Sequence, residues 1–344
     1  MAATLAPSTS AAPARPASLR PSRSRGLVAL LAATVLALVW IGLTIGDLTA
    51  GEVLRTLGGS GEEDFTVFRL RLPRLVLGAA VGVAFGLAGA IFQTVLRNPL
   101  ASPDILGVSG GGSLAAATGI LVLGLSGTAV SGAALLGAFA AAGAIYVLAW
   151  RAGVSGYRFV LVGVGIAFLV QAGLAYLLSR ADVGDARDAL VWMVGSLGTP
   201  SWADVTILLL MLAVLVPLVA VLTGRLRIMQ LGDDVAGGLG LRTEVTRLSA
   251  LALAVALAAA GTAFAGPVAF VAFVSAPIAR RLAPRAGLAL VPSALVGAAV
   301  VLGAELVGEH LLPINAPVGI VTGAVGAPYL LWLLATGNRQ GKGA

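Results

Sequence analysis

The chain has 344 residues, of which 58% are hydrophobic and only 11% are charged, and its mean hydropathy is +1.00. Soluble domains carry about 25% charged residues, so this composition excludes an ordinary soluble protein. The absence of cysteine excludes disulfides, thiolate metal sites and thiol catalysis. The formal net charge of +7 comes without an aromatic and basic surface, so we do not expect nucleic-acid binding.

Apolar segments long enough to cross a bilayer as helices recur along the chain. The sequence therefore predicts an all-α integral membrane protein. We expect residues 1–25, rich in Ala, Pro, Ser and Arg, to form a disordered cationic tail. Residues 26–336 would form a single transmembrane domain, followed by a short tail at 337–344. The predicted spans number about ten and lie at 26–46, 72–96, 104–124, 128–150, 158–179, 202–224, 247–265, 267–282, 287–307 and 317–336.

The distribution of charge predicts how these spans are oriented. An even number of spans places both termini on one side of the membrane. With the termini in the cytoplasm, 16 of the 22 Lys and Arg fall in cytoplasmic segments, whereas 11 of the 15 Asp and Glu fall in external ones. This positive-inside bias indicates a multi-pass protein of the cytoplasmic membrane with cytoplasmic termini. Five spans in each half would make the second half an inverted repeat of the first.

The second span carries a regular series of small residues. Residues 75–96 contain no formal charge, and four glycines follow one another at spacings of 4, 4 and 3. These spacings place the glycines on one helical face, where a neighbouring membrane helix can approach closely. We therefore predict a helix-packing face made of Gly78, Gly82, Gly86 and Gly89.

Polar and charged residues mark the two ends of this span. Arg69, Arg71 and Arg74 precede it on the external side. Gln93 lies near its inner end, where we expect it to hydrogen-bond a neighbouring helix or the backbone. The sequence Arg97-Asn98-Pro99 follows, and the proline disfavours continuation of the helix. We expect the same structural role for Asn98.

The longest internal loop, residues 225–247, has basic flanks and an acidic centre. This pattern favours a short cytoplasmic helix, although a solvated loop is the alternative. Asp233 or Asp234 is expected to cap the start of that helix, and Gly237, Gly238 and Gly240 to end it.

No motif for catalysis or nucleotide binding occurs in the sequence. It lacks G-x-x-x-x-G-K-[ST], H-E-x-x-H and G-x-S-x-G patterns and paired intramembrane carboxylates, so an intramembrane enzyme is not favoured. An ion-gradient carrier is the alternative of another class, but the chain has no ladder of buried acids for it. Glu305 is expected to be interfacial, and His310, the only histidine, lacks partners for a metal site.

Several motifs together resemble the core signature of the FecCD family, the membrane permeases of importers for iron-siderophores, haem and cobalamin. The matching residues are Arg71-Leu-Pro-Arg74, Ala88-Gly89, Gln93, Arg97-Asn98-Pro99-Leu100-Ala101, Pro103 and Ile105-Leu106-Gly107. The resemblance covers residues 27–336. It implies a ten-helix permease subunit without enzyme activity or a cofactor of its own. The implied partners are an ATPase dimer, a second permease (a copy or a homologue) and an external substrate-binding protein.

The resemblance also implies roles for individual residues. Arginines matching Arg71 and Arg74, with Arg69 beside them, dock the binding protein, since guanidinium groups pair well with carboxylates. Interfacial anchoring by snorkelling side chains is the alternative. The family often carries another docking arginine near the last external loop, where this chain has Glu309-His310. This departure favours a homologous second permease rather than a second copy.

Two cytoplasmic segments complete the expected sites. The Gly238-Leu239-Gly240 signature, with Asp233 and Asp234, matches the element that couples such permeases to their ATPase. The turn Ser155-Gly156-Tyr157 matches an inner gate, for which an interfacial tyrosine is the alternative. The expected cargo is a ferric siderophore, with cobalamin and haem as alternatives.

Overall fold

The computed structural model describes residues 22–46, 48–59, 65–104, 106–150, 156–284, 287–313 and 315–340. Within these ranges the regular structure is entirely helical, which confirms the predicted all-α class. The elements are α1 Ser22–Thr44, α2 Ala50–Leu57, η1 Phe65–Arg71, α3 Leu72–Val95, α4 Val108–Leu121, α5 Thr128–Ala149, α6 Gly156–Arg180, α7 Val183–Val194, α8 Trp202–Met229, α9 Asp233–Gly238, α10 Thr243–Ala265, α11 Val271–Leu282, α12 Leu290–Leu306, η2 Val307–Leu311 and α13 Val318–Gln340.

Ten of these helices occupy the ten predicted spans. Seven are long and apolar enough to cross a membrane by themselves. The other three are α4, α11 and α13, of which α4 and α11 are short, with 14 and 12 residues, or about 21 and 18 Å at 1.5 Å per residue. The predicted spans 104–124 and 267–282 were therefore too long. Left-handed residues, Gly107 with φ 81° and Phe270 with φ 64°, interrupt each segment just before its helix begins.

The ends of two other helices differ from the predicted ones. Helix α1 begins at Ser22, inside the predicted tail, and α13 continues to Gln340, beyond the predicted limit of 336. The predicted tails at 1–21 and 341–344 lie outside the described residues. Two short helices, α2 and α7, were not predicted. A capping box signals α2 in the sequence: Thr49 accepts from the backbone of Glu52, whose carboxylate accepts from the backbone of Thr49.

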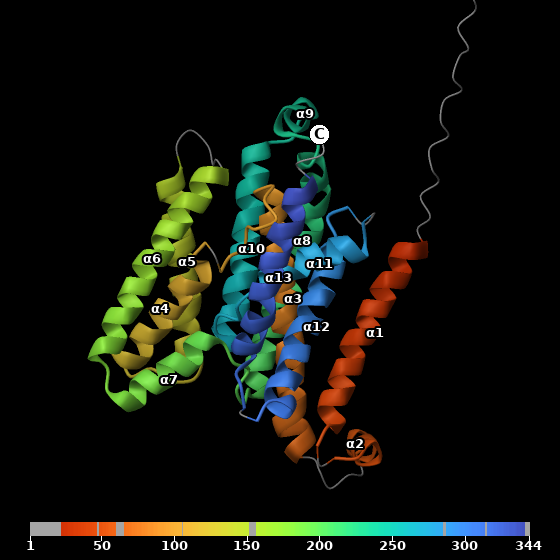
Figure 1. Ribbon diagram of the computed structural model, residues 1–344, viewed down its shortest axis with the longest axis vertical. Helices are drawn as coiled ribbons and strands as arrows, with labels where there is room; N and C mark the ends of the chain where they lie inside the picture. Colours follow the sequence, from red (N-terminus) through yellow and green to blue (C-terminus); the bar gives the residue numbers. More distant parts are fainter. Residues whose placement is uncertain are drawn as a thin grey trace, which may run out of the picture.

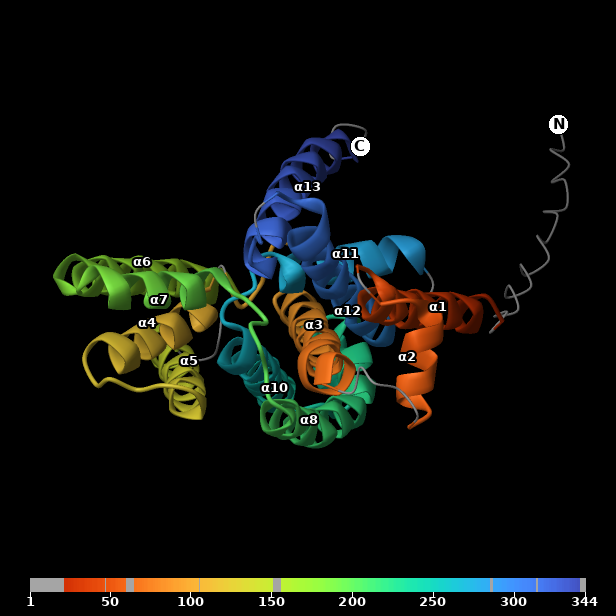
Figure 2. The same ribbon diagram turned by 90° about the horizontal axis from the view of Figure 1, so that it is seen from below.

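Helix α3 forms the centre of the molecule (Figure 2), surrounded by α8, α10, α11 and α12. Its glycines lie against neighbouring backbones. A Cβ atom on Gly82 would come within 2.5 Å of Cα of Ala298 in α12, and one on Gly86 within 3.0 Å of the carbonyl carbon of Ser293. Near the inner end, a Cβ on Gly89 would lie 2.6 Å from the carbonyl carbon of Ala272 in α11. These separations leave no room for a side chain.

The helices α4, α5, α6 and α7 form a second group beside this central bundle (Figure 2). Helix α4 packs on the other three, and α10 joins the group to α3. Helix α6 exposes large apolar side chains along its length, including Phe168 and Leu169. The second group is therefore less enclosed than the bundle around α3.

The two ends of the molecule carry different elements (Figure 1). Helices α2 and α7 lie at the lower end and α9 lies at the upper end, with the last turns of α13 close to it; α1 begins in the upper half and descends toward α2. The long helices run between these ends. The short elements therefore mark the two surfaces at which the chain meets water.

Candidate functional sites

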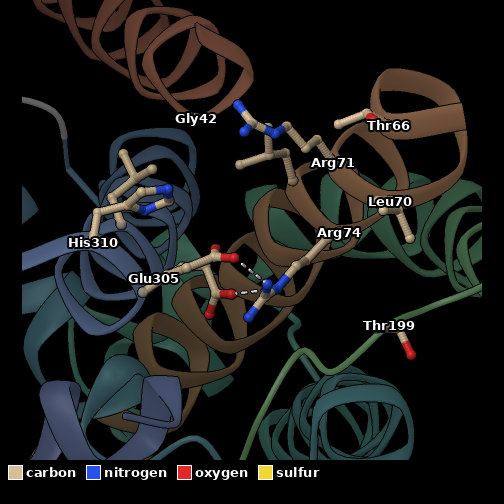
Figure 3. A pocket seen from close by; sticks show the side chains of 11 residues that line it. Gly42, Thr66, Leu70, Arg71, Arg74, Thr199, Glu305 and His310 are labelled. Carbon is tan, nitrogen blue, oxygen red and sulfur yellow. Dashed lines mark hydrogen bonds and ion pairs between the residues drawn. The ribbon is translucent and has the colours of Figure 1, made fainter. Parts of the chain in front are cut away.

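A cavity of about 290 Å³ opens beside the start of α3, at the end of the molecule that carries α2. Figure 3 shows the side chains of Arg71, Arg74, Glu305 and His310 around it. We call the set Arg74, Glu305 and Glu309 the outer charge cluster. Helix α3 supplies its base, while α12 and η2 supply its two acids.

The base of the outer charge cluster is paired with both acids. Nε of Arg74 lies 2.5 Å from Oε1 of Glu305, and Nη1 lies 2.7 Å from Oε1 of Glu309. The side chain of Glu305 is only 4% exposed, so this acid is buried within the protein near the end of α12, and its position at the membrane interface stays a prediction. A carboxylate is stable at this depth because Arg74 supplies a charge-assisted contact.

The other two rim arginines differ from Arg74 in their contacts. Nη1 of Arg71 donates to the carbonyl oxygens of Leu43 and Ile45, at 2.9 and 2.7 Å. It thereby satisfies carbonyl groups at the C-terminal end of α1, where a positive charge is also favoured. Arg69 is exposed, and within the described part of the chain it forms no hydrogen bond or ion pair. The three arginines predicted to act together thus differ in their bonding: Arg71 binds backbone carbonyls, Arg74 binds two acids, and Arg69 has neither kind of partner among the described residues.

Near the inner end of α3, Gln93 is buried and connects α3 to α11 through two hydrogen bonds. Its Nε2 donates to the carbonyl oxygen of Phe273 in α11, at 3.0 Å. Its Oε1 accepts a hydrogen bond from Nη2 of Arg280, also in α11. Sequence reasoning did not identify Arg280 as the partner, because the two residues are 187 positions apart.

After α3 ends, Arg97 adopts a left-handed conformation with φ 48°. Asn98 then accepts a hydrogen bond from the backbone of Leu100, at 2.9 Å, which turns the chain at Pro99. The guanidinium of Arg97 points toward α9: Nη2 donates to Oδ1 of Asp233 at 2.8 Å and to the carbonyl oxygen of Met229 at 3.0 Å. The turn therefore directs the positive charge of Arg97 from the end of α3 to α9.

A second arginine completes this inner charge cluster of Arg97, Asp233 and Arg247. Nη2 of Arg247, in α10, donates to Oδ2 of Asp233 at 2.8 Å. Partial burial alone would raise the pKa of Asp233, but the hydrogen bond and charge of Arg247, with the charge of Arg97, outweigh it and hold this pKa below its usual value. The carboxylate thus joins α3, α9 and α10.

The short helix predicted in the 225–247 loop is α9, but neither aspartate caps it. Gly232, with φ 107°, occupies the N-cap position, and Asp233 is already inside the first turn. The side chain of Asp233 bonds the two arginines instead. Beyond the helix, Gly240 has φ 82°, a conformation that favours glycine. Val235 and Leu239 are 53% and 63% exposed, so α9 presents apolar side chains at the surface.

The predicted gate is described only in part. Ser155 lies outside the described residues, and Gly156 is the first residue of α6. Tyr157 is 76% exposed. No contact of Tyr157 favours a plug over an interfacial residue, and both stay predictions.

Comparisons with known proteins agree with this architecture. The family model described as the FecCD transport family matches residues 30–336. The chain is 36% identical over 320 residues to the ferric enterobactin transport system permease protein FepG of Escherichia coli (strain K12), covering 90% of this chain and 96% of that protein. It is 41% identical over 317 residues to the achromobactin transport system permease protein CbrC of Dickeya dadantii (strain 3937), covering 90% and 91%.

A solved structure has the same fold. It is an inward-facing conformation of a putative metal-chelate type ABC transporter, with a TM-score of 0.79 and 23% identity over 90% of this chain and 99% of the other. The ten membrane helices and the sequence matches thus point to the same conclusion. This multi-pass membrane protein is a transport permease rather than an enzyme, and it belongs to the FecCD transport family.

Proposed function

We propose that this chain is one of two permease subunits of an ATP-driven importer that moves a ferric siderophore across the cytoplasmic membrane. The observation that carries the proposal is the match over 90% of the chain to permeases named for ferric enterobactin and achromobactin transport. Since the sequence has no phosphate-loop motif, ATP would be hydrolysed by a separate ATPase dimer. No cofactor is assigned to this chain.

In the proposed orientation the end carrying α9 faces the cytoplasm. Arg97, Arg247, Arg280 and Arg281 lie toward that end, as the positive-inside rule requires. The last turns of α13 lie near α9, and α1 begins in the same half of the molecule (Figure 1), which supports cytoplasmic termini. The outer charge cluster would then face the compartment from which the cargo is delivered.

We propose that an external binding protein docks on the rim around Arg69. Arg69 is exposed and forms no hydrogen bond or ion pair within the described residues, so it is available to a carboxylate of that protein. Arg71 already caps α1, and Arg74 is held by Glu305 and Glu309. Their part in docking would be to fix the shape of the rim, unless the partner displaces Glu309, whose side chain is 38% exposed.

At the opposite end, α9 is proposed as the element that docks on the ATPase. Its exposed Val235 and Leu239 provide apolar contact area, and Asp234, Gly238 and Gly240 complete the surface. Asp233 connects this element to α3 and α10 through Arg97 and Arg247. A displacement of α9 would therefore act directly on the helix at the centre of the bundle.

The second permease is proposed to cover the face formed by α6 and α13. Both helices lie toward one side of the molecule (Figure 2), and both expose large apolar residues such as Phe168 and Val325. The cargo pathway would run between the two subunits, with Tyr157 near its inner end. Glu309 and His310, in place of a docking arginine, favour a homologue as the partner.

Uptake in a deletion strain tests the proposal. Iron-starved cells would receive labelled ferric siderophores and, separately, labelled cobalamin and haem. Loss of ferric siderophore uptake that this gene restores is the expected result. Loss of cobalamin or haem uptake alone would reassign the cargo. Uptake that persists with an inactive ATPase but collapses with an uncoupler would instead identify an ion-gradient carrier.

A further inference from the structure

A second cavity, of about 370 Å³, lies between α4, α6, the end of α7 and the segment that precedes α11. It is separate from the cavity at the rim. Gly107 and Ser109 border it from the start of α4, and Pro267 and Ala269 border it from the approach to α11. The two shortest membrane helices therefore begin beside the same space.

The depth of this cavity follows from its contacts. Gly107 packs on the backbone of Ala167, where a Cβ would lie 3.1 Å from the backbone nitrogen. Ala167 lies midway along α6, so the cavity is near the middle of the membrane. Helices α4 and α11 are the third spans of the first five and of the last five. Short, interrupted helices at corresponding positions of two halves commonly mark the binding site of a transporter.

Polar groups line the cavity at this depth. Ser109 Oγ donates to Oδ1 of Asp104 at 2.6 Å, whereas Oδ2 of Asp104 is screened from water and has no hydrogen-bond partner among the described residues. Gln171 of α6 is exposed and makes no side-chain hydrogen bond within the described part of the chain. A free amide and a half-satisfied carboxyl group are costly in hydrocarbon.

Neither Asp104 nor Gln171 is among the site residues predicted from the sequence. A purely structural role for Asp104 would explain its hydrogen bond with Ser109, which fixes the start of α4. It does not account for Gln171, which contacts no polar partner there. The lining includes one acid and no basic residue, so it offers hydrogen-bond acceptors to a ligand rather than a counter-charge for an anion.

We propose that Asp104 and Gln171 form a cargo subsite in the translocation pathway, which hydrogen-bonds N–H and O–H groups at the periphery of the ferric chelate. Gln171 binds through its exposed amide, and Asp104 through the free oxygen after rotation of its carboxyl plane. The subsite contacts the organic part of the cargo, not the iron. The inference rests on the importer function proposed above.

The test uses the whole complex in proteoliposomes, with its ATPase, second permease and binding protein. Two probes are compared: an iron-55 ferric tris-hydroxamate with secondary amides, and the same chelate with those amides N-methylated. Because every sample contains the same binding protein, its own preference cancels between variants. The wild type is expected to import the N–H form faster, and Gln171→Leu and Asp104→Asn to reduce that preference about fivefold.

Asp188→Asn, on the exposed face of α7 and outside the cavity, is the matched control and should keep the wild-type preference. A defect in folding would lower import of both probes equally. An unchanged preference in both variants overturns the subsite but leaves the importer intact. If the wild type imports neither probe although ATP is hydrolysed, the hydroxamate cargo and this subsite are both overturned.

The cysteine-free sequence provides a second measurement that tolerates a transport defect. Gln171→Cys should react with a charged methanethiosulfonate reagent, and cargo-loaded binding protein with ATP should slow that reaction several-fold. Val221 is 72% exposed on the membrane helix α8, away from the cavity. Lipid would cover it, and a charged reagent does not enter lipid, so Val221→Cys is the control and should not react. Absence of labelling at Gln171→Cys, or labelling that cargo does not slow, overturns the proposal.

Discussion

The two ends of α3 are held by charge clusters of opposite composition. At the outer end one base, Arg74, lies between two acids, and Glu305 is almost fully buried. At the inner end one acid, Asp233, lies between two bases, and the side chains of Asp233 and Arg97 are 46% and 51% exposed. In the proposed orientation, the composition of each cluster would follow the charge bias of its side of the membrane.

The difference in burial between the two charge clusters indicates that they have different structural roles. The outer charge cluster joins α3 to α12, on which α3 also packs through its glycines. Breaking a buried pair leaves an uncompensated charge, which is costly. The inner charge cluster joins α3 to the short helix α9, and water screens it, so exchanging its partners costs little. The outer end is therefore fixed, whereas the inner end is suited to movement.

The two ends of α3 act on each other only if α3 is rigid between them, and its close packing against α12 supplies that rigidity. Gly82→Leu tests this packing and should have the largest effect. The new side chain would meet the backbone of α12 at Gly297 and Ala298. Because backbone atoms cannot rotate away, we expect almost no folded protein. Gly143→Leu, on α5 where a Cβ meets nothing within 4 Å, is the control. Size-exclusion chromatography in detergent measures the yield, and an equal yield from both variants would contradict close packing.

Glu305→Ala should destabilise the outer end by about 3 kcal/mol, because Arg74 loses its buried partner. Glu309→Ala removes a contact whose acid is 38% exposed, and it should cost less than about 1 kcal/mol. The apparent Tm of each purified variant gives the comparison. Equal shifts would mean that burial does not distinguish the two acids.

Asp233→Ala should hardly change stability, by less than about 1 kcal/mol for an exposed cluster, but it should impair coupling. We expect ATP hydrolysis that no longer responds fully to loaded binding protein, with transport reduced several-fold. Asp188→Ala, which removes an exposed carboxylate from α7 at the end of the molecule away from α9, controls for the loss of a surface charge. Equal stimulation in the wild type and Asp233→Ala would remove the inner charge cluster from the coupling route.

The smallest effect concerns pH. Since the arginines lower the pKa of Asp233 in the folded state, its stabilising contribution is present above the unfolded value of 3.8 and is lost as the pH falls through the lower folded value. The difference in Tm between the wild type and Asp233→Asn should therefore be constant from pH 8 to 5. It should shrink only below pH 3.8. A difference that disappears already near pH 6 would implicate another group.

The sequence allowed the membrane class, the ten helices and the close-packing glycines to be predicted, because hydropathy and small-residue spacing are local signals. Helices α4 and α11 were drawn too long because both flanking segments are apolar. Hydropathy alone does not reveal the left-handed backbone at Gly107 and Phe270.

Pairings between distant residues were beyond sequence reasoning. The partner of Glu305 was not predicted, since nothing local indicates that Arg74 reaches it across 231 residues. Asp233 looked like a helix cap for the same reason, although Arg97 and Arg247 bind it. Charge patterns along the chain predicted which side each group occupies, but not which partner it has.

The helix formed by η1 and α3 is longer than the hydrocarbon layer is thick, which affects where a soluble protein can bind. Helical structure is continuous from Phe65 in η1 to Val95, 31 residues in all, or roughly 45 Å. The hydrocarbon layer is about 30 Å thick. In the proposed orientation this extra length would lie on the outer side and raise Arg69 above the hydrocarbon layer, where a soluble protein could reach it.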